Sequence, residues 1–267
     1  MSDPSTQATA STLTLETRGH VFCIGLNRPQ KLNAFNPEML RELGQAFTRY
    51  ESDAKLRCAL LFAAGKDFTA GLDLANVLPR IEAGEPLFPL DGVDPLEVTG
   101  KGRTKPVVIA MQGRVFTIGI ELALASDIRL CSDDATFSQL EIARGIFPFG
   151  GATFRAPAQL GWGNAMRFLL TAESFGAAEA LRIGLVQETA PRDQLFDRAF
   201  AIAEKVAAQA PLGVRATLAS ARIGLHQGEA HAAKALVAQL PPVLKSDDAK
   251  EGVRSFVERR AGKYTGT

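Results

Sequence analysis

The stretch MQGRVFTIGIELALASD, residues 111–127, decides the fold and carries the first candidate for chemistry. It begins at the end of a β-branched apolar strand, passes Gly113 and Gly119, and enters a helix of small residues with one acidic side chain, Glu121, in its first turn. The start of a helix offers backbone N–H groups without intrahelical partners and the positive end of the helix dipole. A carboxylate beside them in apolar company suits enolate or oxyanion chemistry. The alternative is that Glu121 only complements the helix dipole.

Length and composition indicate an ordinary globular chain. The 267 residues, 46% of them hydrophobic, can form one large domain or two modest ones around a sizeable core. A net charge of +1 gives no basic excess for nucleic acid or an anionic membrane surface. No apolar run approaches the roughly 18 residues of a membrane span. We expect a cytoplasmic, soluble protein with no nucleic-acid or membrane partner, and a disordered lead-in at residues 1–11 that lacks signal-peptide features.

The cysteines and histidines show no metal pattern. Cys23, Cys58 and Cys131 are odd in number, widely spaced and embedded in apolar strand-like runs, which is typical of buried thiols in a reducing compartment. The histidines have no spacing for metal or triad chemistry. We therefore expect no metal site.

Hydrophobic periodicity predicts mixed strands and helices followed by helices alone. Alternation over 13–26 predicts a β-hairpin, and the continuous apolar run 58–63 predicts a strand covered on both faces. The remaining strands are expected at 107–111, 127–131, 136–138 and 185–189, and helices at 37–52, 150–160, 162–170, 177–183, 193–209, 211–226, 228–240 and 247–260. The change of pattern predicts a core over 12–195, which holds the active site, and a helical region over 196–267.

The segment 76–105 differs from its surroundings because prolines and glycines alternate with scattered apolar residues. No sustained helix is expected from Pro86 to Pro95. Long loops inside compact domains are typically lids, binding loops or disordered segments. The apolar content favours a partly ordered cover over an apolar pocket, formed by Leu87, Phe88, Leu90 and Leu96.

Two further segments carry candidate chemistry. In AAGKDFTAGLDL, residues 63–74, Gly65 and Gly71 bracket a loop that can aim N–H groups at a ligand oxygen, although such loops are most often simple turns. In QLEIARGIFPFGGAT, residues 139–153, Glu141 is a second carboxylate. A helix running out and a strand returning can bring Glu121 and Glu141 to one pocket. The alternative for Glu141 is a solvated or ion-paired loop residue beside Arg144.

Taken together, these segments resemble the crotonase superfamily, the enoyl-CoA hydratase and isomerase group. The resemblance extends from about residue 13 to 266 and is carried, in the family's order and spacing, by residues 27–35, 68–74, 105–113, 119–130, 137–148, 168–186 and 251–264. It implies an α/β fold, a spiral of ββα turns with a C-terminal helical trimerisation region, assembled as a homotrimer or hexamer. It also implies an acyl-CoA thioester as substrate, with no permanently bound cofactor.

The resemblance also implies roles for individual residues. The oxyanion hole falls on the backbone N–H groups of Leu72 and Ile118, and the catalytic acids fall on Glu121 and Glu141. Two acids favour hydration of a 2-enoyl thioester, in which Glu121 deprotonates water for attack at Cβ and Glu141 exchanges a proton at Cα. Isomerases of the family commonly rely on the second position alone. Contacts to coenzyme A or substrate are expected from Arg28, Lys31, Leu32, Ala70, Asp73 and Leu74, and from Lys263, which can reach across from a neighbouring subunit.

Four positions depart from the family pattern. Many hydratases have Gly at the positions of Thr117, Ile118 and Phe149, and Ala at that of Leu72. A β-branched Ile strains where φ must be positive, which would damage the oxyanion hole; alternatively, these side chains reshape the acyl pocket. Phe149 also replaces the Asp of the dienoyl isomerases. Three hypotheses remain: an enoyl-CoA hydratase, a Δ3,Δ2-enoyl-CoA isomerase or other enolate-forming enzyme, and a non-catalytic acyl-CoA-binding protein.

Overall fold

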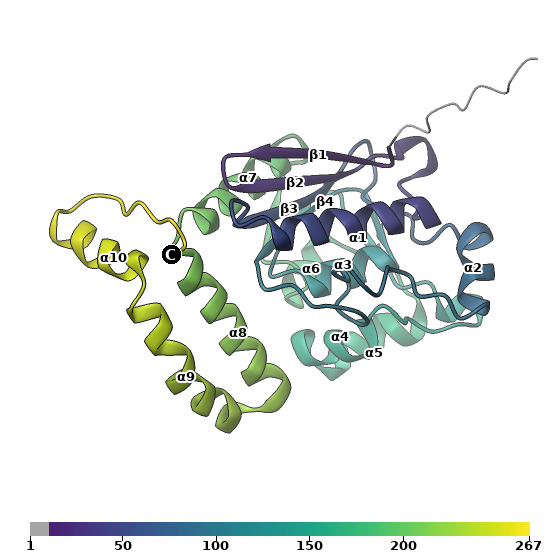
Figure 1. The fold of residues 1–267 in the computed structure, drawn as a ribbon. Helices are drawn as coiled ribbons and strands as arrows, with labels where there is room; N and C mark the ends of the chain where they lie inside the picture. Colours follow the sequence, from purple (N-terminus) through teal and green to yellow (C-terminus); the bar gives the residue numbers. More distant parts are fainter. Residues whose placement is uncertain (1–10) are drawn as a thin grey trace, which may run out of the picture.

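A computed structural model describes residues 11–267, so the expected lead-in lies, apart from Ser11, outside the described residues. Two sheets and their helices form a core, and three helices extend from it (Figure 1). The larger sheet contains β1 (Leu13–Arg18), β2 (Val21–Leu26), β3 (Cys58–Ala63), β4 (Val107–Met111), β6 (Ile128–Ser132) and β9 (Glu188–Ala190). The smaller sheet contains β5 (Arg114–Phe116), β7 (Thr136–Ser138) and β8 (Phe175–Gly176).

The helices follow the strands in a repeating order. The core helices are η1 (Pro29–Lys31), α1 (Pro37–Ser52), α2 (Leu74–Glu82), α3 (Ile118–Ala125), η2 (Ile142–Arg144), α4 (Ala152–Leu160), α5 (Trp162–Thr171), α6 (Ala177–Arg182) and α7 (Arg192–Ala207). The extension holds α8 (Pro211–Gln227), α9 (Glu229–Leu244) and α10 (Asp247–Val257). The unit β4–β5–α3, one strand in each sheet and then a helix, is repeated by β6–β7 and the helices behind them. This is the predicted ββα spiral.

The larger sheet is parallel except for β1, which forms the predicted antiparallel hairpin with β2. Its apolar strands are covered on both faces, as the continuous runs predict. On one face lie α1 and α3. On the other, α7 presents small residues at helical spacing, which let the helix approach the strands closely: Ala199, Ala203 and Ala207.

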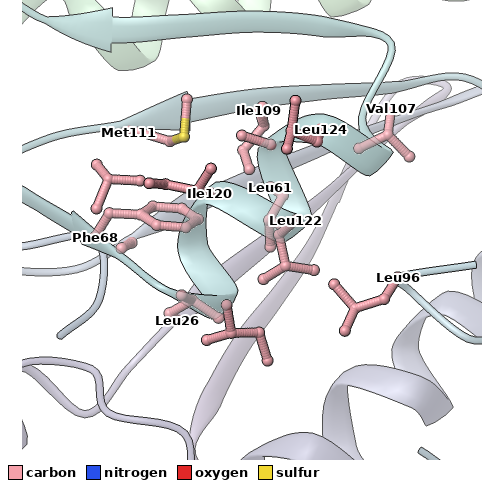
Figure 2. Packing of buried hydrophobic residues seen from close by; sticks show 14 of the residues in the cluster. Leu26, Leu61, Phe68, Leu96, Val107, Ile109, Met111, Ile120, Leu122 and Leu124 are labelled. Carbon is pink, nitrogen blue, oxygen red and sulfur yellow. The ribbon is translucent and has the colours of Figure 1, made fainter. Parts of the chain in front are cut away.

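Helix α3 lies inside the core. All its residues are buried, and Ile120, Leu122 and Leu124 pack among side chains from β3, β4 and the segment 94–97 (Figure 2). A helix that is apolar all round is stable only when it is surrounded by protein. Within α3, Glu121 is the one charged residue, so the surrounding apolar packing sets its electrostatic environment.

Some boundaries differ from the prediction. Helix α2 continues through Pro79 to Glu82, so the long irregular segment begins only after it, whereas Pro86 to Pro95 contains no helix, as predicted. Strand β9 begins at Glu188, where pairing with β6 begins, three residues after the predicted start at Leu185. Helix α9 runs through two prolines to Leu244, beyond the predicted end at 240.

The segment between α2 and β4 packs onto the core at several points. Phe88, Val93 and Leu96 are buried, while Leu90 is exposed. Arg103, buried, donates to Asp127 at 2.6 Å and to the carbonyl oxygens of Lys105 and Ala125. These bonds fix the end of the segment against the C-terminal end of α3.

The extension is attached to the core by a few polar contacts. Helices α8 and α9 lie against each other, and α10 lies farthest from the core (Figure 1). Arg222 of α8 donates to the carbonyl oxygen of Arg103 at 2.6 Å, and Arg57 of the core donates to the carbonyl oxygen of Tyr264 at 2.7 Å. Across residues 11–267, every helix is too short or too polar to cross a membrane.

Asn33 joins two loops that sequence patterns did not connect. Its side-chain oxygen accepts from the N–H of Arg28 at 2.7 Å, and its amide donates to the carbonyl oxygens of Ala64 and Asp67 at 2.9 and 2.8 Å. Asn33 is fully buried and adopts a left-handed conformation with φ of 53° at its neighbour Leu32 and 51° at its own position. The loop after β2 and the loop after β3 are therefore held together by one side chain.

We predict that Asn33→Ala lowers the free energy of unfolding by about 3 kcal/mol, because three buried hydrogen-bonding groups lose their partner. Denaturant unfolding measures the change. The matched control is Gln30→Ala, an exposed position in the same loop, for which a change within about 0.5 kcal/mol is expected. Equal losses in the two variants would contradict a specific role for Asn33.

Candidate active site

The turn that leads into α3 has an unusual backbone. Thr117 has φ of 51° and ψ of −111°, the angles of the first central residue of a type II′ turn, where Gly is preferred. A β-branched residue there is strained by about 1–3 kcal/mol. Ile118 is instead the first residue of α3 and does not have positive φ. The prediction of backbone strain at Ile118 is therefore wrong by one residue, because the positive φ occurs at Thr117.

This turn sets the direction of the Ile118 N–H. The carbonyl oxygen of Thr117 accepts from the N–H groups of Ile120 and Glu121, at 2.9 and 3.2 Å, and so points into the first turn of the helix. In a trans peptide the following N–H points the opposite way. The N–H of Ile118 therefore points out of the helix, and it has no hydrogen-bond partner within the described part of the chain.

The loop after β3 lies directly beside this turn. Thr69 donates through its N–H to the carbonyl oxygen of Arg114 at 2.9 Å and accepts from the N–H of Phe116 at 3.1 Å. Gly71 follows with φ of 109°, and a Cβ on it would lie 2.4 Å from Oγ1 of Thr117. Only Gly fits there, because of both the angle and the contact.

Leu72, the next residue, offers the second N–H. The carbonyl oxygen of Gly71 and the N–H of Asp73 both bond to Phe35 in a parallel bridge. Alternate residues of such a bridge face opposite sides, so the N–H of Leu72 faces away from Phe35. It has no partner among residues 11–267. The two N–H groups expected to form an oxyanion hole thus lie on adjoining segments and are both free to bind a ligand oxygen.

Glu121 is buried and held by backbone groups. Its Oε1 accepts from the N–H of Gly150 at 2.7 Å and from that of Ala152, at the start of α4, at 3.4 Å. Burial and, to a lesser extent, the nearby Glu141 carboxylate raise the pKa of Glu121, whereas the two N–H bonds lower it, and the net result is a pKa of about 7. Glu121 therefore does more than complement the dipole of its own helix.

Glu141, 7% exposed, stands just before η2. Its Oε1 accepts from the side-chain amide of Gln139 at 3.0 Å, and its Oε2 is buried without a hydrogen-bond partner. Burial is the main cause that raises the pKa of Glu141 above the ordinary carboxyl value. The alternative of a solvated or ion-paired Glu141 does not hold, since the residue is buried and its Oε2 has no partner, Arg144 included, in the described chain.

A cavity of about 140 Å³ connects these features. Its wall includes six of the thirteen residues expected at the site: Ala70, Leu72, Leu74, Thr117, Glu141 and Phe149, together with Leu140, Arg144 and Ile146. Neither Ile118 nor Glu121 lines it. A Cβ on Gly150 would touch both the Glu121 carboxylate and Cδ1 of Leu96, so Glu121 lies behind the wall, next to the segment that packs over α3.

A family profile described as enoyl-CoA hydratase/isomerase matches residues 16–267. The chain belongs to this family. It is 34% identical over 252 residues to an enoyl-CoA hydratase of Mycobacterium tuberculosis, covering 94% of this chain and 95% of that protein. It is 35% identical over 262 residues to a carnitinyl-CoA dehydratase of Proteus mirabilis, which covers 96% of this chain and 99% of that protein.

Solved structures agree with the family. The structure of a probable enoyl-CoA hydratase/isomerase from Mycobacterium abscessus superposes with a TM-score of 0.93 at 50% identity, over 96% of this chain and 99% of that one. The predicted crotonase fold, including a helical C-terminal region, is confirmed.

The residues expected to contact coenzyme A are only partly free to do so. Arg28 donates to the carbonyl oxygen of Ala34 and lies 3.9 Å from Asp73, so its side chain is largely engaged within the chain. Lys31 and Leu32 are exposed. Lys263 is exposed in the C-terminal tail, and the tail and α2 lie on opposite sides of the molecule (Figure 1). Lys263 therefore does not join the others within one chain.

Gln139 and Gly150 are site residues that sequence reasoning did not assign. Gln139 is fully buried, and its Oε1 has no hydrogen-bond partner among residues 11–267. Its amide holds Glu141, as the N–H of Gly150 holds Glu121. The only signals available in the sequence were a polar residue two positions before Glu141 and a Gly pair before a helix.

A metal site would need a cluster of ligating side chains, and the described part of the chain contains no cluster of three or more His, Cys, Asp or Glu residues placed to hold a metal ion.

We predict that Glu121→Gln stabilises the protein at pH 8. The pKa of Glu121 rises from an ordinary 4.5 to about 7 on folding, so its contribution to stability is complete below pH 4.5 and is lost as pH rises through 7. That loss is on the order of 3 kcal/mol, which Gln does not incur.

Chemical denaturation at pH 5 and pH 8 measures the difference. We expect the variant to gain on the wild type only at the higher pH. The control is Glu204→Gln, at an exposed position on α7, which should leave the pH dependence unchanged. If the free energy of unfolding of the wild type does not fall, relative to that of Glu121→Gln, between pH 5 and pH 8, the raised pKa of Glu121 is contradicted.

Proposed function

We propose that the protein is an enoyl-CoA hydratase, which adds water across the 2,3 double bond of a 2-enoyl-CoA thioester. The observation that carries the proposal is the pair of buried carboxylates, both with raised pKa, beside two backbone N–H groups without partners. The family, and two relatives named for hydration or dehydration of CoA thioesters, support it.

In the proposed reaction the N–H groups of Leu72 and Ile118 bind the thioester oxygen. Attack of water at Cβ moves electron density onto that oxygen and gives an enolate. Donors that are already oriented stabilise this charge without reorganising, and each can lower the barrier by about 3 kcal/mol. The turn at Thr117, held by the surrounding structure despite its backbone strain, points the Ile118 N–H outward.

The two carboxylates then carry the protons. Water must lose a proton as it attacks Cβ, and Cα must gain one, so the pair acts when it holds a single proton. Glu121 takes the proton from water, and Glu141 delivers one to Cα. The mutual repulsion that raises the pKa of Glu121 disfavours the state in which both are ionised. With a pKa of about 7, Glu121 is present in both its protonated and its ionised form near neutral pH.

One observation favours a second candidate, a Δ3,Δ2-enoyl-CoA isomerase. Glu141 lines the cavity whereas Glu121 does not. Isomerisation moves a proton from Cα to the γ-carbon and needs no water, so a single carboxylate at the cavity wall is enough. The two candidates differ in whether Glu121 takes part in the chemistry.

We predict that the wild type adds water to at least one 2-enoyl-CoA in a panel of increasing chain length, as measured by mass spectrometry. Glu121→Gln and Glu141→Gln should each lower kcat for hydration by about 10²–10⁴-fold, because each removes a proton-transfer group. The control Glu204→Gln should keep full activity. No hydration at any chain length would falsify the proposal.

The same panel includes 3-enoyl-CoAs. Turnover of these by Glu121→Gln at the wild-type rate, together with loss in Glu141→Gln, would identify the isomerase. Tight acyl-CoA binding without turnover of either series would identify a binding protein.

We further propose that Lys31 and Leu32, exposed beside the loop that carries Leu72, contact the coenzyme A part of the substrate.

We also propose that residues 196–267 assemble the chain into a homotrimer or a hexamer. Large apolar side chains that are more than half exposed gather on α8–α10: Leu225, Leu236, Val237, Leu240, Leu244, Val253, Phe256 and Val257, of which Phe256 is 84% exposed. Surfaces of this kind mark interaction sites. In an assembly Lys263 can approach the site of a neighbouring subunit.

We predict a solution mass of three or six times the 28.5 kDa chain by light scattering. Val237→Glu, at a 76% exposed position on α9, should lower that mass because it places a charge in the proposed interface. Lys245→Gln changes the charge by the same amount at the end of α9 and should leave the mass unchanged. A monomeric wild type contradicts the proposal.

A further inference from the structure

Arg155 of α4 is a half-buried cation that the proposed reaction has not used. Its Nη1 donates to the carbonyl oxygen of Gly150 at 3.5 Å, and its Nη2 donates to the carbonyl oxygen of Glu97 at 3.1 Å. A planar guanidinium can direct separate N–H groups at two acceptors in a fixed geometry, whereas a lysine ammonium is a compact point charge. Arg155 therefore joins the segment 94–97 to the turn before α4.

The carbonyl of Gly150 lies between the two donors that bind Glu121. The peptide unit before it supplies the N–H of Gly150, and the unit after it supplies the N–H of Ala152, which donate to Oε1 of Glu121 at 2.7 and 3.4 Å. Each peptide unit is rigid, so the direction of one unit limits the directions of its two neighbours. A hydrogen bond to this carbonyl therefore restrains both donors.

Two consecutive glycines make this turn dependent on its surroundings. Glycine has the widest choice of backbone angles, and Gly151 adopts φ of 108°. A Cβ on Gly151 would clash with Nη1 of Arg155, so the main chain and the guanidinium lie in close contact. A Cβ on Gly150 would lie 2.8 Å from Cδ1 of Leu96. The turn is thus held between Arg155 and the segment that Arg155 itself binds.

The charged groups that act on Glu121 come from two elements, Glu141 before η2 and Arg155 of α4. Burial and Glu141 raise the pKa of Glu121, whereas the N–H groups of Gly150 and Ala152 and the charge of Arg155 lower it. Loss of the Gly150 bond would therefore favour the protonated carboxyl.

The charged groups that act on Arg155 are Glu97 and Asp94 of the covering segment, Glu121, and Arg103. Burial lowers the pKa of Arg155, the three carboxylates raise it, and Arg103 lowers it. An arginine keeps its proton throughout the working pH range. A titration near neutral pH in this cluster therefore belongs to a carboxyl group and not to the guanidinium.

We propose that Arg155 is a positioning residue, which holds the Gly150–Gly151 turn so that the N–H of Gly150 stays bonded to the Glu121 carboxylate. Arg155 acts through the main chain and not on the reacting atoms, and no covalent bond to it forms or breaks. Its effect on turnover rests on the proposed function, in which ionised Glu121 takes a proton from water. Its effect on the ionisation of Glu121 does not depend on turnover.

The test measures the pH at which Glu121 ionises in the folded protein. Chemical denaturation from pH 5 to pH 9 gives the difference in unfolding free energy between each protein and the same protein carrying Glu121→Gln. This difference falls as pH rises and levels off at the folded pKa of Glu121, which is about 7 in the otherwise wild-type chain. Arg155→Met and Arg155→Lys should each move that pH upward by about one unit, a tenfold change in the ionisation constant.

The lysine variant separates position from charge, because it keeps the positive charge but loses the planar fork. A shift in Arg155→Met with none in Arg155→Lys means that charge alone acts, and it overturns the inference, as does the absence of a shift in both. If Arg155→Met does not fold, the shift in Arg155→Lys decides alone. The matched control is Arg167→Met, at an exposed position on α5, which should leave the pH unchanged.

Kinetics distinguish this inference from the hydratase itself. With the best 2-enoyl-CoA, Arg155→Lys should move the limb of the kcat/KM profile that Glu121 sets upward by about one pH unit, with KM within about threefold. A protein that hydrates no 2-enoyl-CoA but shows the shift in denaturation refutes the hydratase and supports the role of Arg155. An active hydratase without that shift keeps its function and overturns the role.

Discussion

The buried carboxylate of Glu121 is the constraint on which the site depends. Burial of a carboxylate among apolar side chains is unfavourable unless backbone donors compensate, and here the N–H groups of Gly150 and Ala152 do so. These bonds tie α3 to the start of α4. They also fix the segment that carries Phe149 into the cavity wall. The Glu121 carboxylate, whose burial opposes folding, therefore also joins α3 to α4 and sets the shape of the site.

Three unfavourable features gather within this small region: the raised pKa of Glu121, the strained Thr117 and the orphan Oε2 of Glu141. Each opposes folding, so the remaining structure must compensate for it. The compensation comes from strands buried on both faces and from a helix surrounded by core (Figure 2). A loop site on a rigid sheet keeps its geometry because the sheet, not the loop, supplies the stability.

Sequence predicted the features that follow from local pattern and failed where two segments interact. The apolar runs of β3 and β4 and the Asn36–Pro37 helix start are set by residue type, so their elements were predictable. Neither Thr117 nor Ile118 is Gly, so the local sequence does not indicate which of the two adopts positive φ. In the structure it is Thr117, whose side chain lies against Gly71. Likewise, two of the three bonds of Asn33 reach a loop more than thirty positions away in the sequence and leave no periodic signal.

The segment 94–97 links the site to the C-terminal extension. Leu96 lies against Gly150 and so beside the Glu121 carboxylate. The next residue, Glu97, has a left-handed backbone with φ of 51° and forms an ion pair with Arg222 of α8 at 3.1 Å. Arg155 of α4 donates to the carbonyl oxygen of Glu97 at 3.1 Å. None of the residues of α8 is fully buried, and Leu212 and Leu218 of this helix line surface hollows together with core residues. The ion pair of Arg222 with Glu97 therefore joins α8 to the segment whose Leu96 lies near the Glu121 carboxylate, so the packing of the extension and the environment of the carboxylate are parts of one structure.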